Sequence, residues 1–102
     1  MAKKIKETVA DKAFKKFVAQ AEKKGFVVDG AVGDKETWSC ALFPVGTPAN
    51  TKYAIIDFME WDEDGMSIEW YDLTDKENVI EAQELGHRKT PAGVLSVVSK
   101  KF

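Results

Sequence analysis

The sequence has very few of the residues from which catalytic and metal sites are usually built. Its 102 residues include a single cysteine, Cys40, and a single histidine, His87. One cysteine cannot close an intramolecular disulfide, which excludes the cross-linked secreted scaffolds and favours a reducing, cytoplasmic location. One histidine and one cysteine far apart in the chain are too few ligands for a structural zinc site.

Other signatures of bound cofactors are missing as well. The consecutive acids at residues 62–64 do not follow the alternating ligand pattern of a calcium loop, so we interpret them as a solvated turn. The glycines of "GAVGDKET", residues 30–37, have neither the P-loop spacing nor the dinucleotide-binding spacing. We therefore expect no metal and no cofactor.

Catalytic groups are equally scarce. Cys40 falls on the same alternating strand face as Trp38 and Leu42, so we interpret it as a buried apolar residue rather than a nucleophile. His87 lies in "GHRKT", which we expect to be an exposed connection between helices. The sequence therefore predicts a protein that is not an enzyme.

Long hydrophobic runs are also missing. No segment approaches the roughly 18 apolar residues of a membrane span, and the basic start of the chain is not followed by the apolar stretch of a signal peptide. We expect no membrane association. Because 44% of the residues are hydrophobic and are spread along the chain, residues 1–102 should form one folded α+β domain.

The hydrophobic pattern begins with a helix and continues with strands. Apolar residues recur every three or four positions from Ile5 to Ala21, which predicts an N-terminal amphipathic helix that ends at Gly25. Alternating apolar and polar residues then predict a four-stranded antiparallel meander. Its strands fall within residues 26–32, 37–43, 52–61 and 66–73.

One or two helices are expected after the meander. Thr74 and Glu77 have the spacing of a capping box, and the apolar residues from Val79 to Leu85 predict a helix that ends before Gly86. Thr90 followed by Pro91 is typical of a helix start, which predicts a terminal helix within residues 91–102. The β-branched residues of that segment leave a fifth strand as an alternative.

The charges are strongly segregated along the chain, although the net charge is only −2. Residues 1–52 carry ten lysines and six acids, residues 53–86 carry one lysine and eleven acids, and residues 87–102 carry four basic residues. The central acidic block can be solvated, can face basic segments of the same fold, or can attract a basic partner.

This block contains the hairpin "MEWDEDGMSIEWYDL", residues 59–73. Two-residue and three-residue loops would pair like charges or mix apolar and charged residues on both faces, whereas a four-residue loop at residues 62–65 avoids both. This register pairs Asp57 with Trp70. One face then carries Tyr53, Ile55, Asp57, Met59, Trp61, Met66, Ile68 and Trp70. That face is core if another part of the chain covers it, and a binding surface if nothing does.

The pattern is typical of a small acidic protein-binding module whose hairpin engages a protein partner with a basic surface. Carboxylates would steer the encounter and aromatic side chains would anchor it. By analogy of size and charge alone, inhibitor and immunity-type proteins act in this way, some by presenting carboxylates in place of nucleic-acid phosphates. The candidate partner-binding residues are Trp61, Asp62, Glu63, Asp64, Glu69, Trp70, Tyr71 and Asp72.

Two alternatives stay open. A nucleic-acid-binding module would use the lysine-rich face of the first helix, although the acidic pI of about 5.4 and the single arginine, Arg88, count against it. A homodimer closed over the face of Trp61 and Trp70 would be a ligand-binding or structural domain. The lysines of the helix face are Lys12, Lys15, Lys16, Lys23 and Lys24.

Overall fold

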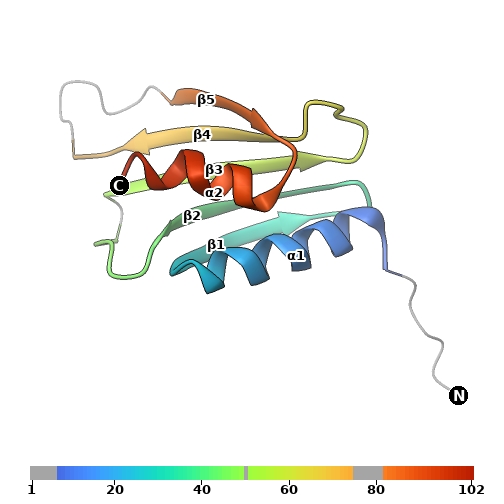
Figure 1. The fold of residues 1–102 in the computed structure, drawn as a ribbon, viewed down its shortest axis with the longest axis horizontal. Helices are drawn as coiled ribbons and strands as arrows, with labels where there is room; N and C mark the ends of the chain where they lie inside the picture. Colours follow the sequence, from blue (N-terminus) through green and yellow to red (C-terminus); the bar gives the residue numbers. More distant parts are fainter. Residues whose placement is uncertain (1–6, 50, 75–81) are drawn as a thin grey trace, which may run out of the picture.

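The computed structural model describes residues 7–49, 51–74 and 82–102. These residues form two helices and five strands, arranged along the chain as shown in Figure 1. The elements are α1 (Val9–Lys23), β1 (Phe26–Gly33), β2 (Thr37–Pro44), β3 (Lys52–Met59), β4 (Met66–Asp72), β5 (Gln83–Arg88) and α2 (Pro91–Ser99).

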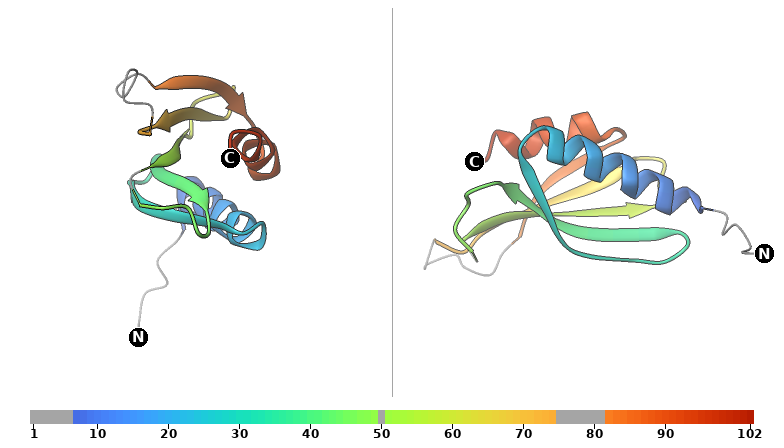
Figure 2. Two further views of the ribbon diagram at one scale, coloured as in Figure 1. Left: turned by 90° about the vertical axis from the view of Figure 1, so that its left-hand side faces the viewer. Right: turned by 90° about the horizontal axis from the view of Figure 1, so that it is seen from below.

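The five strands form one antiparallel sheet in the order β1-β2-β3-β4-β5. Helix α1 packs on β1 and β2, helix α2 packs on β4 and β5, and the two helices contact each other. Both helices therefore lie on the same face of the sheet, as the two views of Figure 2 show. In the part of the chain that the structure describes, no helix covers the opposite face, which we call the open face.

Helix α1 confirms the amphipathic pattern of the sequence, with Phe17 and Ala21 completely buried against the sheet. It begins with a capping box, in which the Thr8 hydroxyl accepts the Asp11 N–H and the Asp11 carboxylate accepts the Thr8 N–H, both at 3.1 Å. Hydrogen bonding of the carboxylate, first to the Thr8 backbone N–H and then to the Thr8 side chain, lowers the pKa of Asp11. The chain leaves the helix through Gly25, whose φ of +82° favours glycine. Ile5, the first apolar residue of the predicted helix, lies outside the described residues.

The core lies between the helices and the sheet. Trp38 on β2 stacks on Phe58 with ring centroids 5.5 Å apart. Phe14 of α1 packs edge-on against Trp38, with ring centroids 5.1 Å apart. At the other end, Trp70 packs edge-on against Phe102 at 4.8 Å. The side chains that are completely buried include Phe17, Leu42, Ile56, Ile68, Val94 and Val98. Cys40 is also buried, as the sequence predicts.

The prediction of four strands is one strand short. Strand β5 pairs with β4 and includes Gln83 and Leu85, where the sequence predicted the end of a helix; the earlier part of that helix, residues 75–81, lies outside the described residues. The pairing satisfies backbone groups along β4 that would otherwise form an open edge, and this tertiary gain outweighs a weak helical preference. The β5 segment also contains Gly86 with a φ of +94°, next to an irregularity in the pairing.

The terminal helix is confirmed, and the alternative of a strand there is wrong. The Thr90 hydroxyl accepts the Gly93 N–H at 3.1 Å, and Pro91 occupies the first helical turn. Val94, Leu95 and Val98 are buried by α2 against the rest of the core. The β-branched residues therefore serve packing rather than a strand.

The predicted register of β3 and β4 is wrong by three residues. Asp57 lies opposite Ser67 rather than Trp70, and Trp70 lies opposite Ala54. Because the shift is an odd number, every β3 side chain changes face relative to the β4 side chains. The core face now carries Ala54, Ile56, Met66, Ile68 and Trp70, which are all buried and all apolar.

The longer β3–β4 loop explains this register. Its backbone is fixed by a bond from the Glu60 N–H to the Glu36 carbonyl at 2.8 Å and by a bond from the Asp62 N–H to the Met59 carbonyl at 3.0 Å. The Asp62 carboxylate also accepts the Asp64 N–H at 2.9 Å. The local comparison of short turns therefore missed the closure that buries only apolar residues of β3 and β4.

Candidate functional site

The open face carries side chains in three rows that run across the strands, because neighbouring residues of a strand point to opposite faces. The first is an aromatic row, and the second and third contain the carboxylates. The aromatic row consists of Val27, Phe43, Tyr53 and Tyr71. The acidic row consists of Asp29, Ala41, Ile55, Glu69 and Glu84. The polar row consists of Val32, Ser39, Asp57, Ser67 and His87.

Two tyrosines form the centre of the aromatic row. Tyr53 and Tyr71 lie opposite each other on β3 and β4, and their rings are stacked with centroids 5.1 Å apart and planes 14° apart. The Tyr71 hydroxyl donates a hydrogen bond to Glu69 Oε2 at 3.1 Å. Burial, and then the hydrogen bond to Glu69, raise the pKa of Tyr71. A tyrosine hydroxyl is protonated at neutral pH in any case, so it can donate this bond and hold Glu69 beside the rings.

Three carboxylates lie in the rows on one side of this pair. Among the described residues, no lysine, arginine or histidine nitrogen lies within 4 Å of the carboxylate of Asp57, Glu69 or Glu84. Glu69 and Glu84 lie directly opposite each other on β4 and β5. Directly opposed like charges destabilise a sheet, so this arrangement costs stability in the free protein.

A pocket of about 260 Å³ lies beside Tyr53 on the open face. Its apolar lining comes from the aromatic row and from the segments that follow β2 and β4, and its two charged residues are of opposite sign. The lining residues are Asp29, Ala41, Phe43, Pro48, Ala49, Lys52, Tyr53 and Leu73. The pocket extends the aromatic row with a recess that would accept an apolar side chain.

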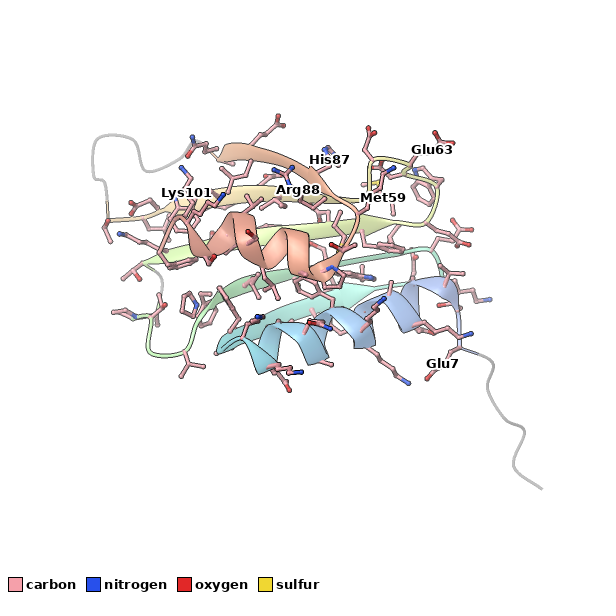
Figure 3. All side chains as sticks on the ribbon, viewed as in Figure 1. Glu7, Met59, Glu63, His87, Arg88 and Lys101 are labelled. Carbon is pink, nitrogen blue, oxygen red and sulfur yellow. The ribbon has the colours of Figure 1, made fainter. Side chains whose placement is uncertain are left out.

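The β3–β4 loop places further acids at one end of the sheet. Trp61 is 63% exposed, and Asp62 Oδ2 lies 3.6 Å from His87 Nε2 on β5. Figure 3 shows the loop residue Glu63 and the strand residue His87 at this end. His87 therefore lies on a strand, not in the connection between helices that the sequence predicts. It joins the polar row to the acidic loop.

The structure divides the predicted binding residues into four groups. Trp61, Asp62, Glu63 and Asp64 lie together on the loop. Glu69 and Tyr71 lie at the centre of the open face. Trp70 is 7% exposed and belongs to the core, and Asp72 lies at the far end of β4, opposite Lys52.

The candidate binding residues from the sequence left out three contributors to the open face. Tyr53 and Asp57 were placed on the same face as Trp70 because the register was wrong, and Glu84 fell in a predicted helix. Strict alternation on β4, with buried Met66, Ile68 and Trp70 between polar residues, was the signal that could have separated the two faces.

A groove on the other side of the sheet is less suited to binding a partner. This groove of about 410 Å³ runs between the start of α1 and the β1–β2 turn, and it is lined by Trp38, whose indole nitrogen has no hydrogen-bond partner among the described residues. That nitrogen is itself buried, so a ligand in the groove would not touch it without a movement of the ring. The carboxylate of Asp34 in this groove already accepts bonds from Glu36 and Thr37, which lower its pKa.

The lysine-rich surface of α1 lies on the helix side of the sheet. The lysines of the α1 face are all exposed, and Lys15 forms an ion pair with Glu7. The positive charge of α1 and the negative charge of the open face are thus carried by different elements of the fold.

No protein-family model matches the chain, and neither a curated protein nor a solved structure matches it significantly. Residues 7–49, 51–74 and 82–102 contain no group of three or more His, Cys, Asp or Glu side chains that could hold a metal ion. None of the described helices has the length and apolar character needed to span a membrane.

Proposed function

We propose that the chain is a small non-enzymatic protein-binding module that engages a partner with a basic surface. Binding takes place on the open face of the sheet and on the acidic loop that adjoins it. The observation that supports this function most directly is the set of carboxylates Asp57, Glu69 and Glu84 near the stacked Tyr53 and Tyr71, with no basic nitrogen within 4 Å of them among the described residues. Tyrosines are enriched at the centres of protein interfaces, and charged residues lie mainly around them, where they set the choice of partner.

The charge of this surface favours protein over nucleic acid. Sheet faces that carry exposed aromatics can stack on bases, but they need positive charge to hold the phosphates. Here the rows beside the tyrosines carry Asp29, Asp57, Glu69 and Glu84, which would repel a phosphate backbone. The same carboxylates can take the place of phosphates in the nucleic-acid site of a basic protein, so an inhibitor or immunity-type role is the finer form of the proposal.

The test is retention of a host protein by the immobilised chain. We expect one or more basic proteins to be retained at low salt and released as salt rises, because opposite charges are screened. Two variants should lose them: Glu69→Gln with Glu84→Gln on the open face, and Asp62→Lys, Glu63→Lys and Asp64→Lys on the loop.

A charge-matched control separates this site from general acidity. Glu7→Gln with Glu22→Gln removes the same charge as the double open-face variant, but from the α1 side. We expect the control to retain the same proteins as the wild type. Equal retention by all variants would overturn the proposal.

The lysines of α1 support a second candidate function, the binding of nucleic acid. Lys12, Lys16, Lys23 and Lys24 are exposed, and none has an ion-pair partner within 4 Å in the part of the chain that the structure describes. Mixing the chain with duplex and single-stranded nucleic acid at low salt tests this function. A salt-dependent complex that Lys16→Gln with Lys23→Gln weakens would favour it over binding of a basic protein.

Association of two copies is the third candidate. The exposed Trp61 and Met59, at 63% and 41%, supply apolar area for such a contact at the loop end of the sheet. Light scattering over a range of concentrations decides it, since a monomer at all concentrations removes the homodimer.

A further inference from the structure

We propose that the open face recognises an arginine side chain of its partner, held between the Tyr53–Tyr71 stack and the carboxylates of Asp57 and Glu69. This inference rests on the proposed function, because it names the group that a basic partner would present. It adds a requirement for shape that attraction between opposite charges alone does not impose.

The two carboxylates are spaced for one planar cation. Asp57 lies opposite Ser67, and Glu69 is two residues further along β4, so Asp57 and Glu69 are diagonal neighbours on one face. Diagonal neighbours of an antiparallel pair have Cα atoms roughly 7–8 Å apart, within reach of both ends of a guanidinium group. Ile55, directly opposite Glu69, supplies an apolar floor between them.

The tyrosines favour a flat cation over a compact one. The Tyr71 hydroxyl occupies one oxygen of Glu69 at 3.1 Å, which keeps the carboxylate beside the ring and leaves its other oxygen able to accept. A guanidinium group can stack on an aromatic ring and donate to a neighbouring carboxylate in the same orientation. A lysine ammonium is a strongly hydrated point charge and gains less from this geometry.

The opposed pair Glu69 and Glu84 is an independent sign of a cationic ligand. Their repulsion is uncompensated among the described residues, since no basic nitrogen lies within 4 Å of either carboxylate. A guanidinium bound at Glu69 would remove that repulsion, so binding recovers stability that the free protein lacks. Surfaces that are unfavourable alone and satisfied in a complex are expected where a charged partner binds.

The experiment compares two peptides of equal charge, hexa-arginine and hexa-lysine, titrated calorimetrically into the full chain. We expect hexa-arginine to bind about tenfold more tightly, and we expect the preference to persist as salt weakens both peptides. Tyr71→Leu should reduce the preference to about twofold or less. Glu69→Gln should weaken hexa-arginine about tenfold, whereas Glu22→Gln on α1 should leave both affinities unchanged.

Tyr71→Phe guards against a folding artefact, because it keeps the ring and loses only the hydroxyl. We expect this variant to melt like the wild type and to retain most of the preference for arginine. Equal affinities of the two peptides for the wild type would overturn the arginine proposal and leave the basic-partner function standing. If neither peptide binds and no basic protein is retained, the proposed function itself fails.

Discussion

Glu69 on β4 and Glu84 on β5 lie directly opposite each other on the open face, without a cation within 4 Å among the described residues. An opposite charge or a neutral residue at one of these positions would make the sheet more stable. Under the proposed function, a cation of the partner would remove this cost on binding.

Replacing Glu84 by Gln should stabilise the free protein. Loss of the repulsion should raise the free energy of unfolding by a few tenths of a kcal/mol, or Tm by about 2 °C. The gain is small because the position is exposed and water screens the charges. Urea unfolding at low salt measures it, and the gain should shrink at 0.5 M salt. A loss of stability, or a gain that does not depend on salt, would contradict the electrostatic origin.

Cys40 should make the protein less stable at high pH. Burial, and to a lesser extent the nearby Asp57 charge, raise the pKa of the thiol from 9.0 to about 12. Between these values the unfolded chain releases the thiol proton while the folded chain keeps it, so its contribution to stability is present below pH 9 and is lost as pH rises toward 12. Only the wild type should lose this contribution, so the stability difference between wild type and Cys40→Ala, measured as unfolding free energies from pH 7 to 11, should be constant below pH 9 and should change in favour of the variant above it.

Reactivity provides an independent check on the same thiol. A buried, protonated cysteine reacts slowly with thiol reagents, so labelling of the folded protein at pH 7.5 should be far slower than labelling in urea. Equal rates would mean that Cys40 is accessible, and the high pKa would then be wrong.

Much of the fold is readable from local sequence patterns. The periodicity of α1, the alternation of β1 and β2, and the Thr90–Pro91 start of α2 all predict elements that the structure contains. These signals are local because each arises from neighbours within a few residues of chain. Strand β5 is different, since Gln83 to Arg88 gain their hydrogen bonds only from β4.

The candidate site could be predicted only in part for the same reason. Glu69 and Tyr71 were identified from charge and aromatic content, and both lie on the open face. Trp70 has the same local character, but its face depends on a register fixed by contacts between distant segments, such as the bond from the Glu60 N–H to the Glu36 carbonyl. Glu84 joins the site only because β5 pairs with β4.

Mutation of the two hairpin tryptophans should therefore affect different properties, stability for Trp70 and partner binding for Trp61. Trp70→Ala should cost about 3–5 kcal/mol, because Trp70 is 7% exposed and packs against Phe102. Trp61→Ala should change stability by less than about 0.5 kcal/mol, because Trp61 is 63% exposed, and should weaken retention of a basic partner. Urea unfolding and the retention assay measure the two effects. Similar stability losses in both variants would show that Trp61 is also a packing residue.

Two glycines with the same backbone angle provide a test of how the acidic loop is held. Gly46 and Gly65 both have a φ of +92°, so alanine is strained at either position. A Cβ at Gly46 would meet nothing within 4 Å, whereas one at Gly65 would lie 2.5 Å from the Arg88 carbonyl oxygen. Gly46→Ala should cost about 1 kcal/mol of stability, and Gly65→Ala about 2–4 kcal/mol.

The difference in stability between these variants measures the effect of the close contact between the loop and the end of β5. If Gly65→Ala pushes the loop away, the 3.6 Å contact between Asp62 and His87 is lost as well, and the loop acids no longer adjoin the polar row. Retention of a basic partner should then fall for Gly65→Ala at temperatures where it remains folded, and should be unchanged for Gly46→Ala. Equal costs in stability for the two substitutions would mean that the loop is not packed against β5, and the acidic tip would then act independently of the open face.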